Sequence, residues 1–327
     1  MSKLLSRAAG SLLGGANGLR QLGYRSGWLR KVRLKAKVVS IGNLTVGGTG
    51  KTPVVMATAR ECLRLGKSVA IVSRNYKAQV SSKAEVDLTR ANAAAYYGDE
   101  PVLLARSLPG VRVFVGPRKS ETAAWAERDF GPFDVVIVDD GFQHWALERD
   151  LDVVLIDAGD EKTFELLPLG RGREDRSALA RADVILLTKV NWAEPDLVRR
   201  TREHLPAGVP VQEVPFVTRW PEVEAVPLGV FSGLGRSAVF AEQARKKYFA
   251  QVQKVWSFAD HQVYGAREVA EFKRFLSQDP RALLVTTEKD AVKIQDDELI
   301  PRLRTAGVEA QIAPGEVFFE KLRSLVR

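Results

Sequence analysis

The sequence predicts an α/β protein in which a mostly parallel sheet is sandwiched by helices. Short apolar stretches alternate with amphipathic helical stretches along most of the chain, and parallel strands require crossover helices of this kind. The first apolar stretch runs into a glycine-rich turn and then a helix, which is typical of α/β proteins that bind phosphates. Because 327 residues exceed the size at which a single core stops growing, we expect two α/β/α domains.

Taken in order, the apolar runs and amphipathic stretches locate the elements. In the first half they predict strands at Val38–Ile41, Val69–Ser73, Val111–Val115, Val135–Asp139, Val153–Asp157 and Val184–Thr188, and helices at 52–66, 99–107, 118–129 and 194–204. In the second half they predict strands at Val226–Ser232, Val255–Phe258, Leu283–Thr287 and Val308–Ile312, and helices near 237–249, 265–277 and 315–326. We expect an N-terminal arm at 1–36, a first domain at 37–158 and a smaller α/β domain at 159–327.

Composition and charge narrow the class of protein. The chain is 45% hydrophobic and 27% charged, which excludes a disordered protein. A single cysteine, Cys62, excludes an internal disulfide framework and a cysteine-rich zinc site, and fits a reducing cytoplasm. No stretch of about 18 apolar residues occurs, so we predict no transmembrane helix.

The N-terminal arm carries the whole positive excess. The net charge is +9, and residues 1–37 contain nine lysines and arginines and no acidic residue, while the other 40 basic residues balance 40 acidic ones. Leucines, Tyr24 and Trp28 are interleaved with these charges. Such a pattern favours an amphipathic segment on an anionic membrane surface. A solvated arm, or one that packs on the first domain, is the alternative.

The glycine-rich turn reads as a phosphate-binding loop, and it makes the predicted fold P-loop NTPase-like. The residues predicted to hold ATP are Thr45, Val46, Gly47, Gly48, Thr49, Gly50, Lys51 and Thr52. The glycines let successive backbone N–H groups point at phosphate oxygens. Lys51 would reach the β and γ phosphates, and Thr52 would offer its hydroxyl to Mg²⁺. The general motif has glycine where this chain has Thr45, and an ordinary glycine-rich turn is the alternative.

A phosphate loop of this kind needs a carboxylate at the end of a neighbouring strand to hold Mg²⁺. Two strands end in aspartate, at Asp139 and at Asp157. We favour the first, because Asp139 is followed by Asp140 and, after Gly-Phe-Gln, by His144, and ligands bind at the carboxyl ends of parallel strands. Thr52 and Asp139 are therefore predicted metal ligands, and Asp140 is a further candidate. For Asp140 and His144 a structural role stays open.

Three further stretches are rich in polar groups. Gly98-Asp99-Glu100-Pro101 opens a predicted helix, and an N-cap at Asp99 alone would explain these polar residues. Ser257-Phe-Ala-Asp260-His261 carries one of only three histidines. Arg171-Gly-Arg173-Glu174-Asp175-Arg176 is either a solvated loop or a site where guanidinium groups hold a phosphate.

Together these motifs resemble the tetraacyldisaccharide 4'-kinase family. The resemblance rests on Ser40–Pro53, Gly98–Pro101, Asp139–His144, Phe258–His261 and Thr286–Lys293, in this order. It implies transfer of the γ-phosphate of ATP, with Mg²⁺, to the 4'-hydroxyl of an acylated glucosamine disaccharide 1-phosphate, a lipid A precursor, which gives the 1,4'-bisphosphate. It also implies a peripheral location on the cytoplasmic face of the bacterial inner membrane. We expect a monomer and no nucleic-acid partner.

The resemblance also implies roles for individual residues. Asp99 would be the general base, paired with His261, and Lys51 would assist the transfer. Asp139 and Asp140 would belong to the Mg²⁺ site, in a cleft that the second domain closes as a lid. Arg118 and Arg173 would face phosphate charge, with Glu174 beside Arg173.

The chain departs from the family pattern in two loops and resembles two other classes less well. Leu167-Pro-Leu-Gly-Arg-Gly-Arg-Glu174 replaces the usual Leu-Pro-Ala-Gly-Pro-Leu-Arg-Glu, and Ser73-Arg-Asn-Tyr76 replaces Ser-Arg-Gly-Tyr. A membrane-recruited regulatory ATPase would carry a second lysine where this loop has Val46. A guanine-nucleotide switch is suggested only by Thr188-Lys-Val-Asn191, which lacks the closing acid.

Overall fold

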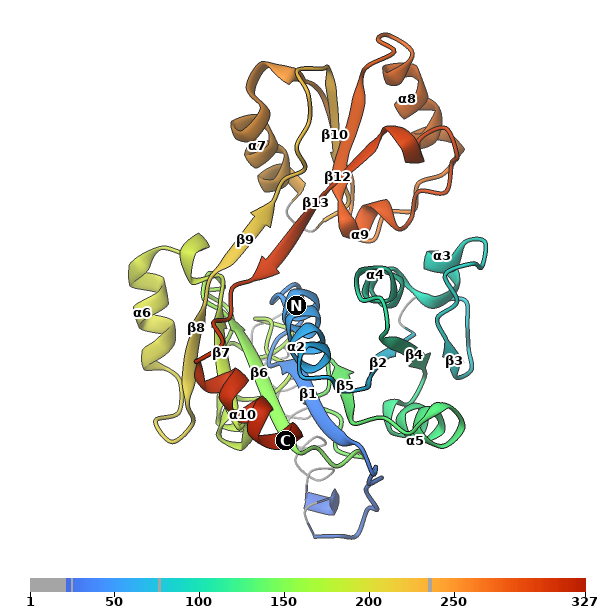
Figure 1. Cartoon of the computed structure of the whole chain (residues 1–327). Helices are drawn as coiled ribbons and strands as arrows, with labels where there is room; N and C mark the ends of the chain where they lie inside the picture. Colours follow the sequence, from blue (N-terminus) through green and yellow to red (C-terminus); the bar gives the residue numbers. More distant parts are fainter. Residues whose placement is uncertain (1–21, 25, 76–77, 235–236) are drawn as a thin grey trace.

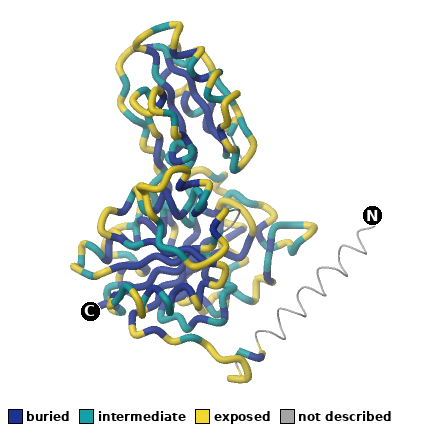
Figure 2. Tube along the Cα trace, turned by 90° about the vertical axis from the view of Figure 1, so that its right-hand side faces the viewer, coloured by how far each residue is buried: buried dark blue, intermediate teal, exposed yellow. Residues whose placement is uncertain are grey.

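The computed structural model describes residues 22–24, 26–75, 78–234 and 237–327, and Figure 1 shows two sheets, each flanked by helices. Within these residues the first sheet has eight strands in the order β3-β4-β2-β5-β1-β6-β7-β8. The second has five, in the order β11-β10-β12-β13-β9. Buried residues line the interior of both parts (Figure 2).

The first sheet is parallel except at one edge, where β3 runs antiparallel to β4. Its strands are β1 (Lys37–Asn43), β2 (Val69–Arg74), β3 (Ala84–Glu85), β4 (Arg112–Gly116), β5 (Val135–Asp139), β6 (Leu151–Asp157), β7 (Val184–Thr188) and β8 (Val211–Val214). Most of its strands are nearly continuous apolar runs. Because successive side chains point to opposite faces, both faces of the sheet are apolar. In β1, Val39 and Ile41 join one core while Val38 joins another.

Helices cover both faces of this sheet. One face carries α2 (Lys51–Arg64), α3 (Ala93–Tyr97), α4 (Asp99–Ser107) and α10 (Val317–Val326), which share one apolar core with the strands. The other face carries α5 (Lys119–Phe130), a 3-10 helix at Arg176–Arg181 and α6 (Pro195–Glu203). The first part of the chain therefore has the predicted three-layer α/β/α arrangement.

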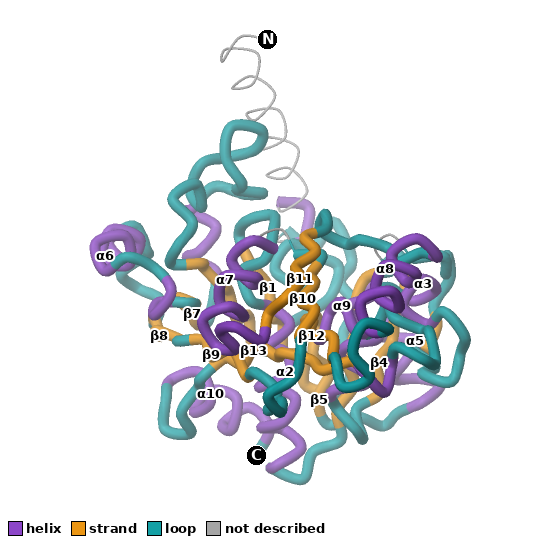
Figure 3. Tube along the Cα trace, turned by 90° about the horizontal axis from the view of Figure 1, so that it is seen from above, coloured by secondary structure: helices purple, strands orange, loops and turns teal. Residues whose placement is uncertain are grey.

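The second sheet is smaller and is built in the same way. Its strands are β9 (Phe216–Arg219), β10 (Leu228–Ser232), β11 (Val252–Ser257), β12 (Leu283–Thr287) and β13 (Leu303–Ala310), of which β9 alone runs antiparallel to its neighbour among the described strands. α7 (Ser237–Tyr248) packs on one face and α8 (Ala266–Leu276) on the other, and α9 (Glu288–Ala291) follows β12. Seen from above, α7 and α8 lie on opposite sides of β10 and β12 (Figure 3).

Two neighbouring strands connect the two parts. The chain leaves the first sheet after β8, enters the second through β9, and returns through β13 to α10. β9 and β13 pair antiparallel from Phe216↔Ala310 to Arg219↔Gly307. On its return α10 packs against α2 and β6 of the first part (Figure 1).

The domain boundary differs from the expected one. The expected boundary after residue 158 falls between β6 and β7, which are neighbouring parallel strands of one sheet. The first sheet continues to Val214, because β8 extends it by pairing with β7. The second domain is thus an insertion at residues 216–310 between β8 and α10.

The predicted N-terminal arm lies mostly outside the described residues, since residues 1–21 and 25 are not described. Its last residues pack on the first domain: Leu34 and Ala36 are buried in the core beneath α5, and Val32 packs against them. The intervening Arg33 faces Glu148 and Asp150 in ion pairs of 2.9 and 3.2 Å. Among the described residues, none of the helices combines the length and apolarity that a bilayer crossing requires.

Candidate active site

The glycine-rich loop, residues 45–52, connects the carboxyl end of β1 to the start of α2. Gly47 and Gly50 have positive φ angles of 108° and 91°, which residues with a side chain rarely adopt. The Nδ2 group of Asn43 donates to Oγ1 of Thr49 at 2.8 Å, and Thr49 is buried. Lys51 opens α2, so the loop ends at a helix N-terminus, where backbone N–H groups favour an anion.

Residues from the end of β7 support this loop from outside. Thr188 donates from Oγ1 to the carbonyl of Thr49 at 2.9 Å. Lys189 donates from Nζ to the carbonyl of Gly48 at 2.5 Å and to Oδ2 of Asp157 at 2.6 Å. Asp157, the second candidate for the metal, is therefore paired with a lysine that contacts the loop.

Arg171 supports the opposite end of the loop. Its carbonyl accepts from the backbone N–H of Val46 at 2.8 Å, and its Nε donates to the carbonyl of Val46 at 3.0 Å. The guanidinium group lies so close to Gly47 that a Cβ there would sit 1.7 Å from Nη2. The loop at Leu167–Glu174, which departs from the family pattern, thus packs directly on the phosphate loop.

Asp139 ends β5 and is buried. Ser73, at the end of the neighbouring β2, donates from Oγ to its Oδ2 at 2.9 Å. Burial and then the negative charge of Glu100 raise the pKa of Asp139 to about 6. The carboxylate therefore lies where ionisation needs a compensating positive charge.

Asp140 has a left-handed backbone, with φ of 53°, and its side chain is held by cations. Arg173 donates to both carboxylate oxygens at 2.9 and 2.7 Å, and Nζ of Lys51 lies 3.6 Å from Oδ1. Burial alone would raise the pKa of Asp140, but the hydrogen bonds from Arg173 and the charge of Lys51 bring it well below its usual range. The structure thus brings together three predicted site residues.

A buried lysine fixes the backbone of both aspartates. Nζ of Lys119 donates to the carbonyls of Asp139 and Asp140, each at 2.6 Å. Burial lowers the pKa of Lys119. Because the two carbonyls point at one ammonium group, Lys119 supports the left-handed turn at Asp140.

The other predicted residues of this region lie in structural contacts. Nε2 of His144 accepts from the backbone N–H of Ser120 at 3.0 Å, in the first turn of α5. Glu174 is buried and accepts from Arg181 at 2.9 Å. Arg118 precedes α5, is exposed, and pairs with Glu121 at 2.7 Å.

Asp99 and His261 meet across the two domains. Asp99 is the first residue of α4, and His261 lies in the loop after β11. Nδ1 of His261 lies 2.9 Å from Oδ2 of Asp99, although 162 residues separate them in the sequence. His261 has a left-handed backbone, with φ of 61°. Lys289, the second residue of α9, lies 3.5 Å from the other ring nitrogen, Nε2.

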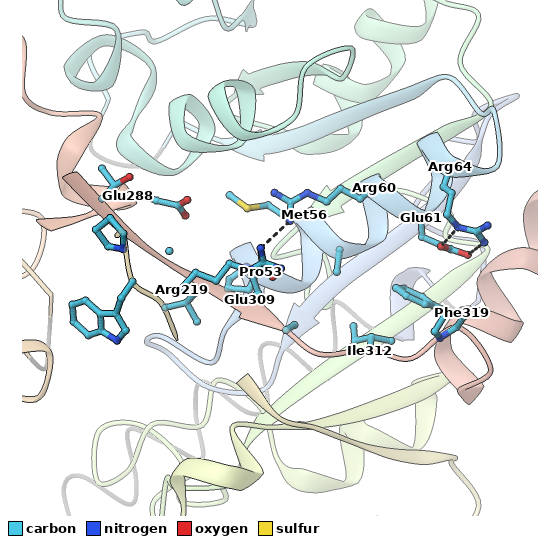
Figure 4. Close-up of a pocket in the computed structure, with 18 residues that line it drawn as sticks. Pro53, Met56, Arg60, Glu61, Arg64, Arg219, Glu288, Glu309, Ile312 and Phe319 are labelled. Carbon is cyan, nitrogen blue, oxygen red and sulfur yellow. Dashed lines mark hydrogen bonds and ion pairs between the residues drawn. The ribbon is translucent and has the colours of Figure 1, made fainter. Parts of the chain in front are cut away.

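A cavity of about 490 Å³ lies apart from these residues, between α2, β9, β13 and α10. Figure 4 shows Arg60 and Arg219 pointing toward Glu309, and Arg219 contacts it at 2.6 Å. Burial raises the pKa of Glu288, which also lines the cavity. None of the predicted site residues lines this cavity, so it belongs to the connection between the domains.

Three lysines at the site were missed by sequence reasoning: Lys119, Lys189 and Lys289. Each follows the carboxyl end of a parallel strand, namely β4, β7 and β12. That position is where ligands bind in open α/β sheets. It is the signal in the sequence that could have found them.

Comparisons with known proteins agree with one another. A family model described as tetraacyldisaccharide-1-P 4'-kinase matches residues 2–327. Proteins named tetraacyldisaccharide 4'-kinase from Bdellovibrio bacteriovorus and Anaeromyxobacter sp. (strain K) are both 39% identical to this chain, over 285 and 322 residues. The alignments cover 83% and 92% of this chain and 84% of each relative.

A solved structure is similar over nearly the whole length. It is LpxK from Aquifex aeolicus, crystallised in complex with ATP, with a TM-score of 0.76 and 26% sequence identity. The match covers 98% of each chain. This likeness and the helix-flanked, mostly parallel sheets confirm the predicted P-loop NTPase-like α/β fold.

Proposed function

We propose the reaction of this chain from its family: the chain belongs to the tetraacyldisaccharide 4'-kinase family, whose members are ATP-dependent kinases of lipid A biosynthesis. In the proposed reaction it transfers the γ-phosphate of ATP to the 4'-hydroxyl of a tetraacyldisaccharide 1-phosphate. The products are ADP and the 1,4'-bisphosphate. The observation that carries the proposal is the 2.9 Å contact between Asp99 and His261, which joins the two domains.

The donor end is the loop at residues 45–52. Its backbone N–H groups and the N-terminus of α2 bind the phosphates, and Lys51 neutralises charge on the β and γ phosphates. Lys51 and Arg173 both face Asp140. Both cations are thus close enough to the loop to turn toward a phosphate. Such positioning and charge neutralisation are most of what phosphoryl transfer asks of a protein.

The residues at the end of β5 fit a Mg²⁺ ion. Asp139 is a buried carboxylate whose pKa is raised to about 6 by burial and by Glu100, and a cation beside it would relieve that cost. Thr52, Asp139 and Asp140 would hold the metal, with phosphate oxygens and waters completing the shell. When bound, Mg²⁺ supplies positive charge to the β and γ phosphates.

The acceptor end is the Asp99–His261 pair. The carboxylate of Asp99 takes the proton of the 4'-hydroxyl while the oxygen bonds to the γ-phosphorus, and the bond to the β-γ bridging oxygen breaks with its electron pair leaving on ADP. A sugar hydroxyl is a weak nucleophile, and a positioned base of this kind contributes about 10²- to 10⁴-fold. His261 orients the carboxylate through Nδ1.

The acylated substrate implies work at a lipid surface. We propose that the chain acts as a peripheral monomer on the cytoplasmic face of an anionic inner membrane, through its basic N-terminal arm. Support comes from the segment next to the first domain, where Trp28 is 89% exposed and Arg30 and Lys31 are also exposed. An aromatic ring beside cations suits the headgroup region.

The test is a phosphate-transfer assay with radiolabelled ATP, Mg²⁺ and acyl disaccharide 1-phosphate in detergent micelles. We expect labelled bisphosphate from the wild type, and a kcat at least 100-fold lower for Asp99→Ala, with little change in the KM for ATP. His261→Ala should lower kcat by a smaller factor than Asp99→Ala. Glu242→Ala, which removes an exposed carboxylate on α7 of the second domain, is the control. ATP hydrolysis that ignores the disaccharide, or a preference for GTP, would contradict the proposal.

A further inference from the structure

Lys289 lies at the centre of a cluster that spans both domains. Its Nζ is 3.4 Å from Oε1 of Glu100 and 3.9 Å from Oδ2 of Asp99, both on α4 of the first domain. The same Nζ is 3.8 Å from Oδ1 of Asp260 and 3.5 Å from Nε2 of His261, both in the loop after β11. The side chain is only 19% exposed.

The backbone on either side of Lys289 is held rigidly. Thr287 caps α9 by accepting from the N–H of Asp290 at 3.1 Å. Asp290 is fully buried and accepts from the backbone of Gly233 at 3.0 Å and from the hydroxyl of Tyr264 at 2.9 Å. Because α9 is fixed in this way, Lys289 has a defined direction, toward α4.

The hydrogen-bonding capacity of Lys289 and Asp99 decides which ring nitrogen of His261 carries hydrogen. An ammonium group only donates, so at Nε2 of His261 it needs a lone pair. A neutral ring with its lone pair at Nε2 carries its proton at Nδ1, and Nδ1 faces Oδ2 of Asp99. Lys289 and Asp99 therefore both favour the same tautomer, the one with hydrogen on Nδ1.

We propose that Lys289 is a positioning residue that holds His261 in the Nδ1–H tautomer and opposes a second proton on the ring, so that Asp99 remains the base. This inference rests on the proposed function and names a further residue for it. The ring is then a neutral donor to Asp99. A doubly protonated ring would instead form an ion pair with Asp99 and weaken the carboxylate as a base.

The charges around the ring make this contribution necessary. Asp99 and Glu100 face the ring region from α4, and Asp260 lies 3.9 Å from Nε2 through its Oδ2. These carboxylates would attract a second proton to the ring, and Lys289 is a cation that contacts Nε2 at 3.5 Å. Burial alone would lower the pKa of Lys289, but the surrounding carboxylates raise it, so the amine stays protonated at neutral pH.

The first experiment is a pH–rate profile of Lys289→Met in the same phosphate-transfer assay. Without the ammonium group the ring takes a second proton more readily, so the acid limb of kcat should move to higher pH by about one unit. The kcat of Lys289→Met should fall toward about one tenth of the wild-type value on the acid limb and equal it on the plateau at higher pH. Lys289→Arg keeps the cation and should keep the wild-type profile. Lys246→Met, which removes an exposed lysine of the same domain, is the control.

The possible outcomes separate this inference from the proposed function. An inactive wild type would contradict the function itself. An active wild type whose acid limb is unchanged in Lys289→Met would overturn the role of Lys289. A loss equal at every pH with a raised KM for ATP would also overturn it, because it would mean that Lys289 contacts the nucleotide.

A second experiment needs no variant at the lysine. The chain has three histidines, so ¹⁵N spectra of histidine-labelled protein at pH 8 can report the tautomer of each ring, with His261→Gln identifying the signals of His261. We expect hydrogen on Nδ1 and a bare Nε2. A ring with hydrogen on Nε2, which free histidine prefers in water, would overturn the inference even if Lys289→Met failed to fold.

Discussion

The ring of Phe216 lies directly against Gly50 of the glycine-rich loop. A Cβ at Gly50 would sit 2.5 Å from both Cε2 and Cζ of the ring. Phe216 is also the first residue of β9, and Asn191 bonds both its backbone N–H and its carbonyl at 2.9 Å. The strand that leads into the second domain therefore begins on the phosphate loop.

Gly50→Ala should damage both the loop and this contact. The new Cβ would meet the ring of Phe216, and φ is 91°, so we expect a loss of about 2–4 kcal/mol in the free energy of unfolding and a raised KM for ATP. Gly66→Ala is the matched control, because Gly66 has φ of 74° but nothing within 4 Å of its Cβ position. It should lose about 1 kcal/mol and keep the wild-type KM. Equal losses in urea denaturation would refute the role of the contact.

Asp139→Asn and Asp157→Asn distinguish the two candidates for the metal. We expect Asp139→Asn to lower kcat about 100-fold or more and to raise the Mg²⁺ concentration needed for half-maximal rate. Asp157 pairs with Lys189, so Asp157→Asn should change the KM for ATP more than kcat. A Mg²⁺ titration of both variants is the measurement. The reverse result would assign the metal to the end of β6.

Lys189→Met should loosen the phosphate loop without touching the acceptor end. The variant loses the 2.5 Å bond to the carbonyl of Gly48 and leaves Asp157 without its partner. A charged hydrogen bond contributes about 1.5–3 kcal/mol, so the KM for ATP should rise about tenfold or more. The KM for the disaccharide should not change. Lys246→Met, at an exposed lysine on α7, serves for comparison.

Cys62 should be unreactive in the folded chain. Its thiol is fully buried on α2, and burial, helped by the charge of Glu61, raises its pKa to about 12. Ellman's reagent at pH 8 should therefore react fully in urea and negligibly in buffer. The unfolded thiol ionises near pH 9, so below that pH it contributes no pH dependence. Stability should fall as pH rises from about 9 toward 12, and Cys62→Ala should remove this part of the decline. Rapid labelling of the native chain would contradict this burial.

Trp28→Ala should weaken membrane binding and leave the fold unchanged. The indole is exposed and adjoins the basic residues of the arm, so its removal should lower the affinity for vesicles of phosphatidylglycerol and phosphatidylethanolamine. Phe249→Ala removes a ring that is 78% exposed on the second domain and is the control. Deletion of residues 1–30 should also reduce the salt dependence of binding. Unchanged co-sedimentation with vesicles would remove the membrane role from this segment.

Local patterns predicted most of the elements because their information lies within a few residues. Buried strands such as β5 and β6 are continuous apolar runs, and the glycine-rich loop is defined by its own sequence and its place between strand and helix. β8 and β9 were missed because they are short, contain polar residues and are separated only by Pro215. The inserted second domain was missed because α10 contacts α2, about 250 residues earlier, and nothing local encodes that contact.

The candidate site was predictable only where its residues belong to one segment. The pairing of Asp99 with His261 came from the family resemblance, since no spacing rule joins residues 162 positions apart. The structural contacts of His144 and Glu174 depend on Ser120 and Arg181, and those partners could not be read from either motif. The catalytic roles of Asp99 and His261 stay predictions until Asp99→Ala and His261→Ala are measured.

The return of α10 to the first domain sets the order in which the chain can fold during synthesis. Residues 216–310 are complete, with their own core, while the last helix is still unmade. The first domain, in contrast, lacks Phe318, Leu322 and the Arg323 partner of Glu61 until the final turn emerges from the ribosome. The inserted domain can therefore finish folding first. The first domain, although most of it is synthesised earlier, stays incomplete, with the apolar face of α2 partly uncovered. Loss of the last few residues would thus destabilise the first domain around α2, which is far from those residues in the sequence.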